Sequence, residues 1–185
     1  MSSAKHPRVV RKKVSYSSPW FTVMAKEVVY PWKTGSETYF SVKSLEYCSA
    51  LALTKEGYVI LVKQFRPVLE QYTYELPSGC VEKGETPRMA MERELKEETG
   101  FSSNGRMQFL AQLHPDSGRL ENMLWCYFAP KALPNSLAGR NVEPGIETVL
   151  CSPRELKKLI TSGKFNHAPH MGIVALAVMK GKLAL

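Results

Sequence analysis

The sequence predicts a single α+β domain, and three observations support this class. Many short runs rich in β-branched and aromatic residues are separated by turn signals, with a few helical segments among them. Strands and helices do not alternate regularly, which argues against a repeating β-α-β order. With 185 residues, 44% of them hydrophobic and 23% charged, the chain can bury one core but is short for two ordinary domains.

The N-terminal part is expected to be a basic arm followed by a β extension. Residues 1–13 carry five Lys or Arg and no acidic residue, a composition typical of a solvated, disordered arm. Two β-like runs follow, at 20–30 and 37–45, with turn signals between them. We therefore expect one domain over 14–185, whose first part, 14–45, is an antiparallel pair of strands.

The central part alternates between candidate strands and one strong helix. Strands are expected at 49–53, 58–63, 72–76, 107–113, 124–128 and 147–151. The helix should begin at Pro87, because Thr86 is a suitable N-cap and proline is favoured at the first helical position. It should end at Gly100, since glycine is common just after a helix end.

Two further helices are expected near the C-terminus. Ser152 and Glu155 form a predicted capping box around Pro153, so a helix should run from there to about 162–163. Residues 171–179 are predominantly apolar and predict a buried closing helix.

Composition restricts the partners and the location. No apolar run approaches the roughly 20 residues that a membrane span needs, and no signal sequence is recognisable, so a cytoplasmic location is expected. The net charge of +8 has two interpretations: a polyanionic partner such as nucleic acid, or a basic arm combined with an anionic substrate. The five charges in 1–13 favour the second interpretation.

The four cysteines are far apart without metal-ligand spacing, so core positions are expected rather than disulfides or zinc ligands.

Three acidic residues in the first predicted helix carry the chemical signal. Glu94 and Glu98 lie about 40° apart around a helix, and Glu94 and Glu97 lie about 60° apart. Like charges at this spacing oppose each other, and a hard cation such as Mg²⁺ prefers such oxygen ligands. The alternative is a solvated acidic face with Arg93 and Lys96 as local partners.

The surrounding segment, residues 79–101, distinguishes between these interpretations. It resembles the Nudix box, G-x5-E-x7-R-E-U-x-E-E-x-G-U, in which U is a bulky apolar residue. Every fixed position of the motif is filled, by Gly79, Glu85, Arg93, Glu94, Leu95, Glu97, Glu98, Gly100 and Phe101.

The resemblance implies a fold, a metal and a set of roles. The fold is an α/β/α sandwich with a mixed sheet, and the cofactor is Mg²⁺, with Mn²⁺ as an alternative. The metal ligands that it implies are Glu94, Glu98, Glu97 and the carbonyl of Ser78. Glu97 is also a candidate base. Arg93 would orient the carboxylates through ion pairs, and Glu85 would lie at the positive end of the helix dipole.

The segments 60–67 and 74–79, together with Pro115, resemble the ADP-ribose and ADP-sugar pyrophosphatase branch of this family. By this resemblance Arg66 would grip the diphosphate with Glu75 in the substrate site, the alternative for Arg66 being a surface ion pair.

The same branch implies a homodimer in which aromatic residues of the N-terminal strands stack on the adenine. Trp20 and Tyr39 are at matching positions. The alternative for both is core packing.

Three positions depart from the branch pattern. Ser78 replaces the usual alanine, which leaves the backbone carbonyl available. Gly118 stands near the place of a common acidic residue. The late loop usually has acids two and four positions before Ile146, but these positions are Pro144 and Val142 here; Glu143 and Glu147 are the nearby acids. A shift of one residue would make Glu143 the catalytic base.

The expected function is Mg²⁺-dependent hydrolysis of the diphosphate in a nucleotide sugar, with ADP-ribose giving AMP and ribose 5-phosphate. The alternatives are another nucleotide sugar such as GDP-mannose, an RNA-end pyrophosphohydrolase, or a Nudix fold that binds nucleic acid. The basic arm favours the nucleic-acid alternatives slightly. An intact motif argues against a pure binding module.

Overall fold

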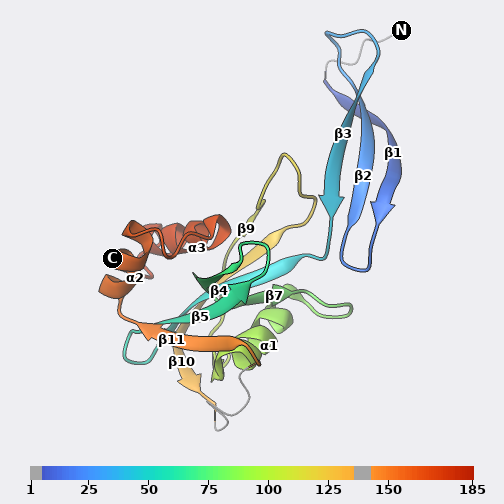
Figure 1. The fold of residues 1–185 in the computed structure, drawn as a ribbon. Helices are drawn as coiled ribbons and strands as arrows, with labels where there is room; N and C mark the ends of the chain where they lie inside the picture. Colours follow the sequence, from blue (N-terminus) through green and yellow to red (C-terminus); the bar gives the residue numbers. More distant parts are fainter. Residues whose placement is uncertain (1–5, 136–142) are drawn as a thin grey trace. The chain divides into compact units, whose positions relative to one another are not determined.

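The computed structural model describes residues 6–135 and 143–185, which belong to two compact units. The first unit comprises residues up to Leu45 and the segment His114–Met123. The second comprises Glu46–Leu113 and Leu124–Leu185 and contains the Nudix-like segment. Both units are labelled by element in Figure 1, and each is described separately below.

The first unit is a three-stranded antiparallel sheet. Its strands are β1 (Arg8–Ser17), β2 (Thr22–Val29) and β3 (Ser36–Lys43), in the order β1-β2-β3. The segment 114–123 is attached to β3, because the N–H of Val42 donates to the Arg119 carbonyl and the N–H of Glu121 donates to the Val42 carbonyl. An ion pair of 2.7 Å between Lys26 Nζ and Glu121 Oε1 adds a side-chain link.

The expected disordered arm over 1–13 is wrong for residues 8–13, which form the first part of β1 and pair with β2. The side chains of β1 are exposed along the whole strand. Charge density therefore correctly indicated solvated side chains, but it does not report whether the backbone is paired. Residues 1–5 lie outside the described part of the chain.

The second unit is built on an eight-stranded mixed sheet, and its strand order along the main path is β11-β5-β4-β10-β8. The strands are β4 (Tyr47–Thr54), β5 (Val59–Arg66), β6 (Gln71–Glu75), β7 (Ser78–Cys80), β8 (Phe101–Ser102), β9 (Gln108–Leu113), β10 (Leu124–Pro134) and β11 (Ile146–Cys151). Strands β4 and β10 run parallel, while the other pairs are antiparallel. The predicted mixed sheet is confirmed.

Helices cover both faces of this sheet (Figure 1). Helix α1 (Pro87–Thr99) packs on one face through Met91 and Leu95, whereas α2 (Pro153–Thr161) and α3 (Ala168–Met179) cover the other. Because successive side chains of a strand alternate between faces, neighbours such as Ile60 and Leu61 enter different core clusters. The result is the expected α/β/α arrangement.

The predicted helix ends are confirmed in detail for α1 and α2. The Thr86 hydroxyl accepts a hydrogen bond from the N–H of Met89, and Gly100 closes α1 with a left-handed φ of 71°. Ser152 and Glu155 form the capping box of α2. Helix α3 begins at Ala168, three residues before the expected start, because Pro169 lies in its first turn.

Three of the four cysteines lie at the buried positions expected for them. All four cysteines are free; Cys48, Cys126 and Cys151 are buried, and Cys80 is exposed. Across residues 6–135 and 143–185, no helix is long and apolar enough to cross a membrane.

Candidate active site

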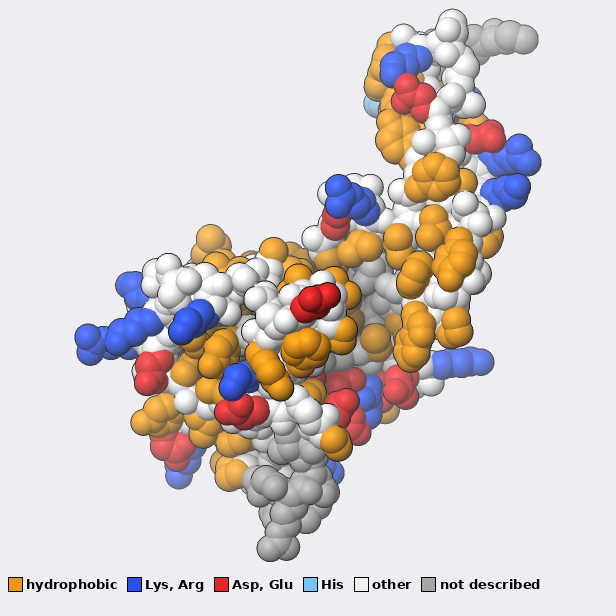
Figure 2. Space-filling model, in the orientation of Figure 1, with side chains coloured by type: hydrophobic (Ala, Val, Ile, Leu, Met, Phe, Trp, Pro, Cys, Tyr) orange, Lys and Arg blue, Asp and Glu red, His pale blue; other side chains and the backbone are white. Residues whose placement is uncertain are grey.

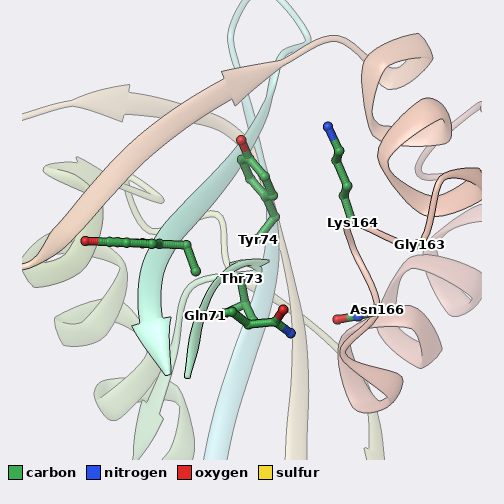
Figure 3. Close-up of a pocket in the computed structure, with 7 residues that line it drawn as sticks. Gln71, Thr73, Tyr74, Gly163, Lys164 and Asn166 are labelled. Atoms are coloured by element: carbon green, nitrogen blue, oxygen red, sulfur yellow. The ribbon is translucent and has the colours of Figure 1, made fainter. Parts of the chain in front are cut away.

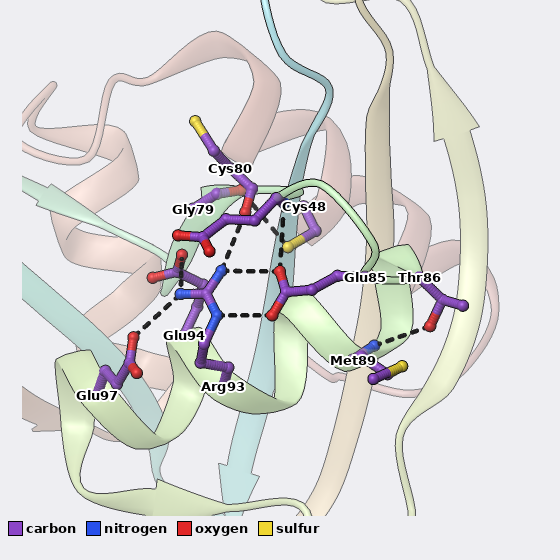
Figure 4. A network of polar contacts seen from close by, with 10 residues as sticks. Cys48, Gly79, Cys80, Glu85, Thr86, Met89, Arg93, Glu94 and Glu97 are labelled. Atoms are coloured by element: carbon purple, nitrogen blue, oxygen red, sulfur yellow. Dashed lines mark hydrogen bonds and ion pairs between the residues drawn. The ribbon is translucent and has the colours of Figure 1, made fainter.

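Helix α1 and the turn before it place one arginine among several carboxylates (Figure 4). Arg93 on α1 donates to Glu94 at 2.7 Å and to Glu97 at 3.0 Å, both through Nη1. Its Nε and Nη2 donate to the two carboxylate oxygens of Glu85 at 2.9 and 3.1 Å, and Nη2 also donates to the Cys80 carbonyl. Arg93 thus forms ion pairs with these carboxylates, and its role in orienting them stays a prediction.

Glu85 has a different partner from the one expected. It precedes the N-cap, and its carboxylate accepts from Arg93 and from the N–H of Glu82 at 3.2 Å. The hydrogen bonds from Arg93 lower the pKa of Glu85. Glu85 therefore fixes the arginine and the preceding loop, and the helix dipole is not its main contact.

Gly79 provides the space in which the Glu94 carboxylate lies. A Cβ atom at position 79 would lie 2.0 Å from Cδ and Oε1 of Glu94, far inside van der Waals contact. Glycine is therefore required here by the close approach of a carboxylate. The motif glycine and the motif glutamate form one structural unit, although 15 positions separate them in the sequence.

Glu98 is the most deeply buried acid of this group, with 4% of its surface exposed. Its Oε2 accepts the N–H of Ser78 at 2.8 Å. Burial raises the pKa of Glu98 to about 8, and the charges of Glu94 and Glu143 add to the rise, while the Ser78 N–H and Arg66 oppose it. A carboxylate in this environment is stabilised in its ionised form by an added cation.

Glu143 joins this group from the late loop. Its N–H donates to the Glu97 carbonyl at 3.1 Å, and its charge raises the pKa of Glu94 and Glu98. The competing acid, Glu147, lies in β11 and forms an ion pair of 2.9 Å with Lys63. The geometry thus favours Glu143 over Glu147 as the acid of this loop. Val142 lies outside the described residues.

The donor set fits a hard divalent cation. Glu94 and Glu97 accept from Arg93, and the carboxylate of Glu94 lies within Coulomb range of those of Glu97, Glu98 and Glu143. Oxygen donors in excess of local positive charge are what Mg²⁺ and Mn²⁺ select. Ser78 begins β7, and its N–H donates to Glu98, so the backbone of Ser78 lies beside these acids.

Arg66 and Glu75 form a second charged group in this unit. Nε and Nη2 of Arg66 donate to the two oxygens of Glu75, each at 2.7 Å, and Thr73 Oγ1 donates to Glu75 Oε1 at 2.7 Å. Burial alone would raise the pKa of Glu75, but hydrogen bonds from Arg66 and Thr73 bring it down to about 2. Glu75 is 1% exposed, so the expected direct contact of Glu75 with substrate is not supported.

Arg66 itself keeps a free edge toward solvent. Its side chain is 41% exposed, and the Glu75 hydrogen bonds use only Nε and Nη2. The guanidinium also lies within Coulomb range of Glu98. Arg66 therefore forms the ion pair that the alternative interpretation expected. It is also a fixed hydrogen-bond donor within Coulomb range of Glu98.

Two hollows adjoin this second group. One, of 350 Å³, is lined by Arg66, Glu75, Asn166 and His167 together with Val68 and Leu69. The other, of 310 Å³, lies between β6 and the turn after α2; Figure 3 shows Gln71, Thr73 and Tyr74 facing Lys164 and Asn166. The acids of α1 do not line either hollow. Glu94 and Glu97 instead project from α1 toward Arg93, as Figure 4 shows.

Trp20 and Tyr39 belong to the first unit. Trp20 is 83% exposed and lines a hollow of 570 Å³ with Phe21 and Leu45. Tyr39 is 48% exposed, and its hydroxyl accepts a hydrogen bond from the Tyr30 hydroxyl and donates one to Glu37. The alternative that either ring is a core residue is therefore wrong for this chain. The residues that line the Trp20 hollow do not include Tyr39.

The sequence interpretation missed His170 and His167. His170 is 1% exposed, and its Nδ1 accepts the N–H of Leu76 at 3.1 Å. His167 is the N-cap of α3, and its ring lies 4.0 Å from that of His170, measured between centroids. The available signal was two histidines three positions apart at the start of an apolar helix. This spacing does not by itself identify the segment that His170 contacts.

Comparisons with known proteins agree with the fold and with the motif of residues 79–101. The NUDIX domain model matches residues 47–171. The ADP-ribose pyrophosphatase of Bacillus subtilis (strain 168) is 36% identical over 96 residues, which cover 52% of this chain and 51% of that protein. The ADP-sugar pyrophosphatase of Mus musculus is 42% identical over 74 residues, 38% of this chain and 34% of the relative.

A solved structure described as an ADP compounds hydrolase superposes with a TM-score of 0.80 at 22% identity, covering 99% of this chain and 100% of the other. At this identity the likeness concerns the fold alone. This chain spans about half or less of the length of the two curated relatives. With the motif complete and the family model matching most of the chain, the protein belongs to the Nudix domain family.

Proposed function

We propose that the protein is a divalent-cation-dependent hydrolase of the diphosphate in a nucleotide sugar, with ADP-ribose as its substrate and AMP and ribose 5-phosphate as the products. The observation that carries this proposal is the group of carboxylates around Arg93, together with the buried Glu98 within Coulomb range of Glu94. The relatives named as ADP-ribose and ADP-sugar pyrophosphatases support the substrate class.

The proposed cation ligands are the carboxylates of Glu94, Glu97 and Glu98 and the carbonyl of Ser78. Mg²⁺, or Mn²⁺ in its place, would neutralise the diphosphate and polarise the phosphorus that is attacked. Arg93 holds Glu94 and Glu97 in place through Nη1. The Ser78 N–H fixes one oxygen of Glu98, so its other oxygen is oriented as well.

The attacking water needs a group that accepts its proton. Glu143 is proposed for this role, with Glu97 as the second candidate, because the late loop is attached to α1 by the hydrogen bond from the Glu143 N–H to the Glu97 carbonyl. A carboxylate oxygen of Glu143 would take the proton as the water oxygen bonds to phosphorus, while the bond from that phosphorus to the bridging oxygen breaks and the other monophosphate leaves.

Arg66 is proposed to bind a phosphate oxygen of the substrate. Because Glu75 holds Nε and Nη2, the remaining edge of the guanidinium has one orientation, and the substrate does not have to order the side chain. Glu75 acts in this proposal through Arg66.

A panel of substrates tests the function. Nucleoside monophosphate and phosphate release would be measured with Mg²⁺ and with Mn²⁺ for ADP-ribose, other ADP-sugars, GDP-mannose and capped RNA. The proposal predicts fastest turnover of ADP-ribose. Strong hydrolysis of GDP-mannose or of capped RNA without hydrolysis of ADP-ribose would contradict the substrate while leaving the family intact.

We also propose a homodimer, with Trp20 or Tyr39 stacking on the adenine. Large apolar side chains are exposed on the first unit, as the orange surface over its strands shows in Figure 2. They include Val9, Val10, Val14, Tyr16, Trp20, Phe21, Trp32 and Phe40. An exposed apolar sheet favours association, and a twofold-related copy is a common solution.

The cytoplasmic location stays a prediction of the sequence.

Trp20→Ala tests the stacking. Because stacking contributes alike to the ground and transition states, the KM for ADP-ribose should rise about tenfold with kcat nearly unchanged. Trp32→Ala is the matched control, since Trp32 is also an exposed tryptophan of the first unit. Equal effects of the two substitutions would contradict a specific role of Trp20. A fully active monomer by light scattering at micromolar concentration would contradict the dimer.

A further inference from the structure

The corner between β6 and β7 is held by a residue from the far end of the chain. β6 ends at Glu75 and β7 begins at Ser78, so Leu76 and Pro77 form the corner. The N–H of Leu76 donates to His170 Nδ1 of α3 at 3.1 Å. The carbonyl of Pro77 accepts the N–H of Ala50 and the hydroxyl of Ser49 on β4. Helix α3 and strand β4 thus fix the two halves of this corner.

Both charged groups of the candidate active site are attached to this corner. Immediately before it, Glu75 holds the guanidinium of Arg66. Immediately after it, the N–H of Ser78 binds the Glu98 carboxylate at 2.8 Å. A displacement of Leu76 would therefore move the phosphate-binding group and the cation-binding group relative to each other.

The hydrogen bond determines the protonation of His170. An amide N–H can only donate, so Nδ1 must be unprotonated, and the neutral ring carries its proton on Nε2. Burial lowers the pKa of His170 to about 3, with His167 and Arg66 acting in the same direction and Glu75 opposing them. His170 therefore remains a neutral acceptor over the ordinary range of pH.

Packing alone does not account for an imidazole at this position. The buried face of α3 consists of His170, Ile173, Val174 and Ala177, and the last three are apolar. A leucine would fill a similar volume without burying a polar ring. The buried N–H of Leu76 would then lack its acceptor, at a cost of about 1–3 kcal/mol. Nε2 of His170 itself has no hydrogen-bond partner among the described residues, so the hydrogen bonding of the ring is directed to the Leu76 N–H alone.

A metal site is the competing interpretation. Glu75, His167 and His170 offer ligand atoms within 4.8 Å of one another, a set that zinc accepts. However, both oxygens of Glu75 accept from Arg66, and Nδ1 of His170 accepts from Leu76. Because Nε2 of the neutral ring then carries the proton, His170 has no free lone pair to give to a metal ion.

We propose that His170 is a positioning residue, which holds the β6–β7 corner so that Arg66 and Glu98 keep their relative placement for hydrolysis. The role depends on the acceptor atom and not on the volume of the ring. The inference rests on the proposed function for its kinetic readout, while its structural readouts are independent of any substrate.

Two substitutions separate the acceptor from the volume. In His170→Asn, the amide oxygen takes the place of Nδ1 but the side chain is smaller; in His170→Leu, the volume is kept and the acceptor is lost. We expect kcat of the Leu variant to fall about tenfold at a temperature well below unfolding, and the Asn variant to retain most of it. Equal kcat of the Leu variant and the wild type would overturn the proposal, as would an Asn variant as slow as the Leu variant.

Two measurements on the wild type keep the proposal testable if the Leu variant does not fold or if the substrate is wrong. Nitrogen NMR should show His170 as the neutral Nε2–H tautomer from about pH 8 to about pH 5. Hydrogen exchange should show the Leu76 amide strongly protected. The Nδ1–H tautomer, or an unprotected Leu76 amide, would overturn it. Zinc retained at one ion per chain by the wild type and lost in His170→Asn would also overturn it in favour of a metal site.

Discussion

Arg93 and Arg66 are both held by carboxylates, but the first arrangement leaves an excess of negative charge, whereas the second is a neutral pair with unused hydrogen-bond donors. Arg93 is shared among Glu85, Glu94 and Glu97 beside the buried Glu98, so negative charge remains. Arg66 is bound by one buried carboxylate, Glu75, and keeps a free edge of its guanidinium. The first arrangement suits a divalent cation and the second suits a phosphate oxygen. In the proposed function, two residues of one type thus prepare complementary halves of one site.

Glu98→Gln tests the acidic half and should have the largest effect. The change removes a ligand charge from a nearly unchanged shape, so kcat should fall about 1,000-fold while the fold is kept. Glu82→Gln is the matched control, because the same change is made at an exposed residue of the same turn. Near-normal turnover of a folded Glu98→Gln at saturating Mg²⁺ would remove the acidic half from the mechanism.

Gly79→Ala tests whether the placement of one carboxylate matters as much as its presence. The added Cβ would lie 2.0 Å from Glu94 Cδ, so the carboxylate must move. A displacement of this size should lower kcat about 100-fold. Gly172→Ala serves as the control, because its Cβ would meet Leu113 at an ordinary contact of 3.5 Å. If Gly79→Ala and Gly172→Ala have equal kcat, the position of Glu94 is not critical.

Arg66→Lys tests the second half and should have a smaller effect. Lysine keeps the charge but lacks the fork that Glu75 holds, so kcat/KM should fall about tenfold. Glu75→Gln should cause a similar loss, and the double variant should lose little more, because both changes disrupt one unit. Arg154→Lys, on the exposed face of α2, is the control. Additive losses would show that Glu75 acts separately from Arg66.

The pH dependence of stability gives the smallest effect. The pKa of His170 in the folded state, about 3, lies below its ordinary value near 6.5, so its contribution is complete above about pH 6.5. It decreases as the pH falls below this value, by about 1.4 kcal/mol per pH unit. His170→Asn lacks this titration, and denaturant unfolding of both proteins from about pH 7.5 to about pH 5 would show the difference. Parallel pH profiles of the two proteins would contradict this account.

The sequence predicted the parts of the site that lie within one continuous segment. Helix periodicity placed Glu94, Glu97 and Glu98 on one face, and the motif predicted ion pairs between Arg93 and the carboxylates. In the structure, Glu94 and Glu97 are two of the partners of Arg93. The caps of α1 and α2 were also local signals.

Contacts between distant segments could not be predicted in the same way. The hydrogen bond between the Leu76 N–H and His170 Nδ1 spans 94 positions, and the two residues do not form a recognisable sequence motif. The burial of Glu75 depends on the packing of β6, and residues 8–13 pair with β2 although their side chains suggest a solvated arm. Motifs report residue types at fixed spacing, whereas these features depend on tertiary packing.

Cation binding by the wild type, Glu98→Gln and Arg66→Lys is the most direct test of the division between the two halves. Mn²⁺ would be titrated into each protein without substrate and followed by electron paramagnetic resonance. The account predicts that Glu98→Gln loses most of its Mn²⁺ affinity, whereas Arg66→Lys binds Mn²⁺ like the wild type and is impaired only toward ADP-ribose. Unchanged Mn²⁺ affinity in Glu98→Gln would contradict the assignment of the carboxylates around Arg93 as the cation site.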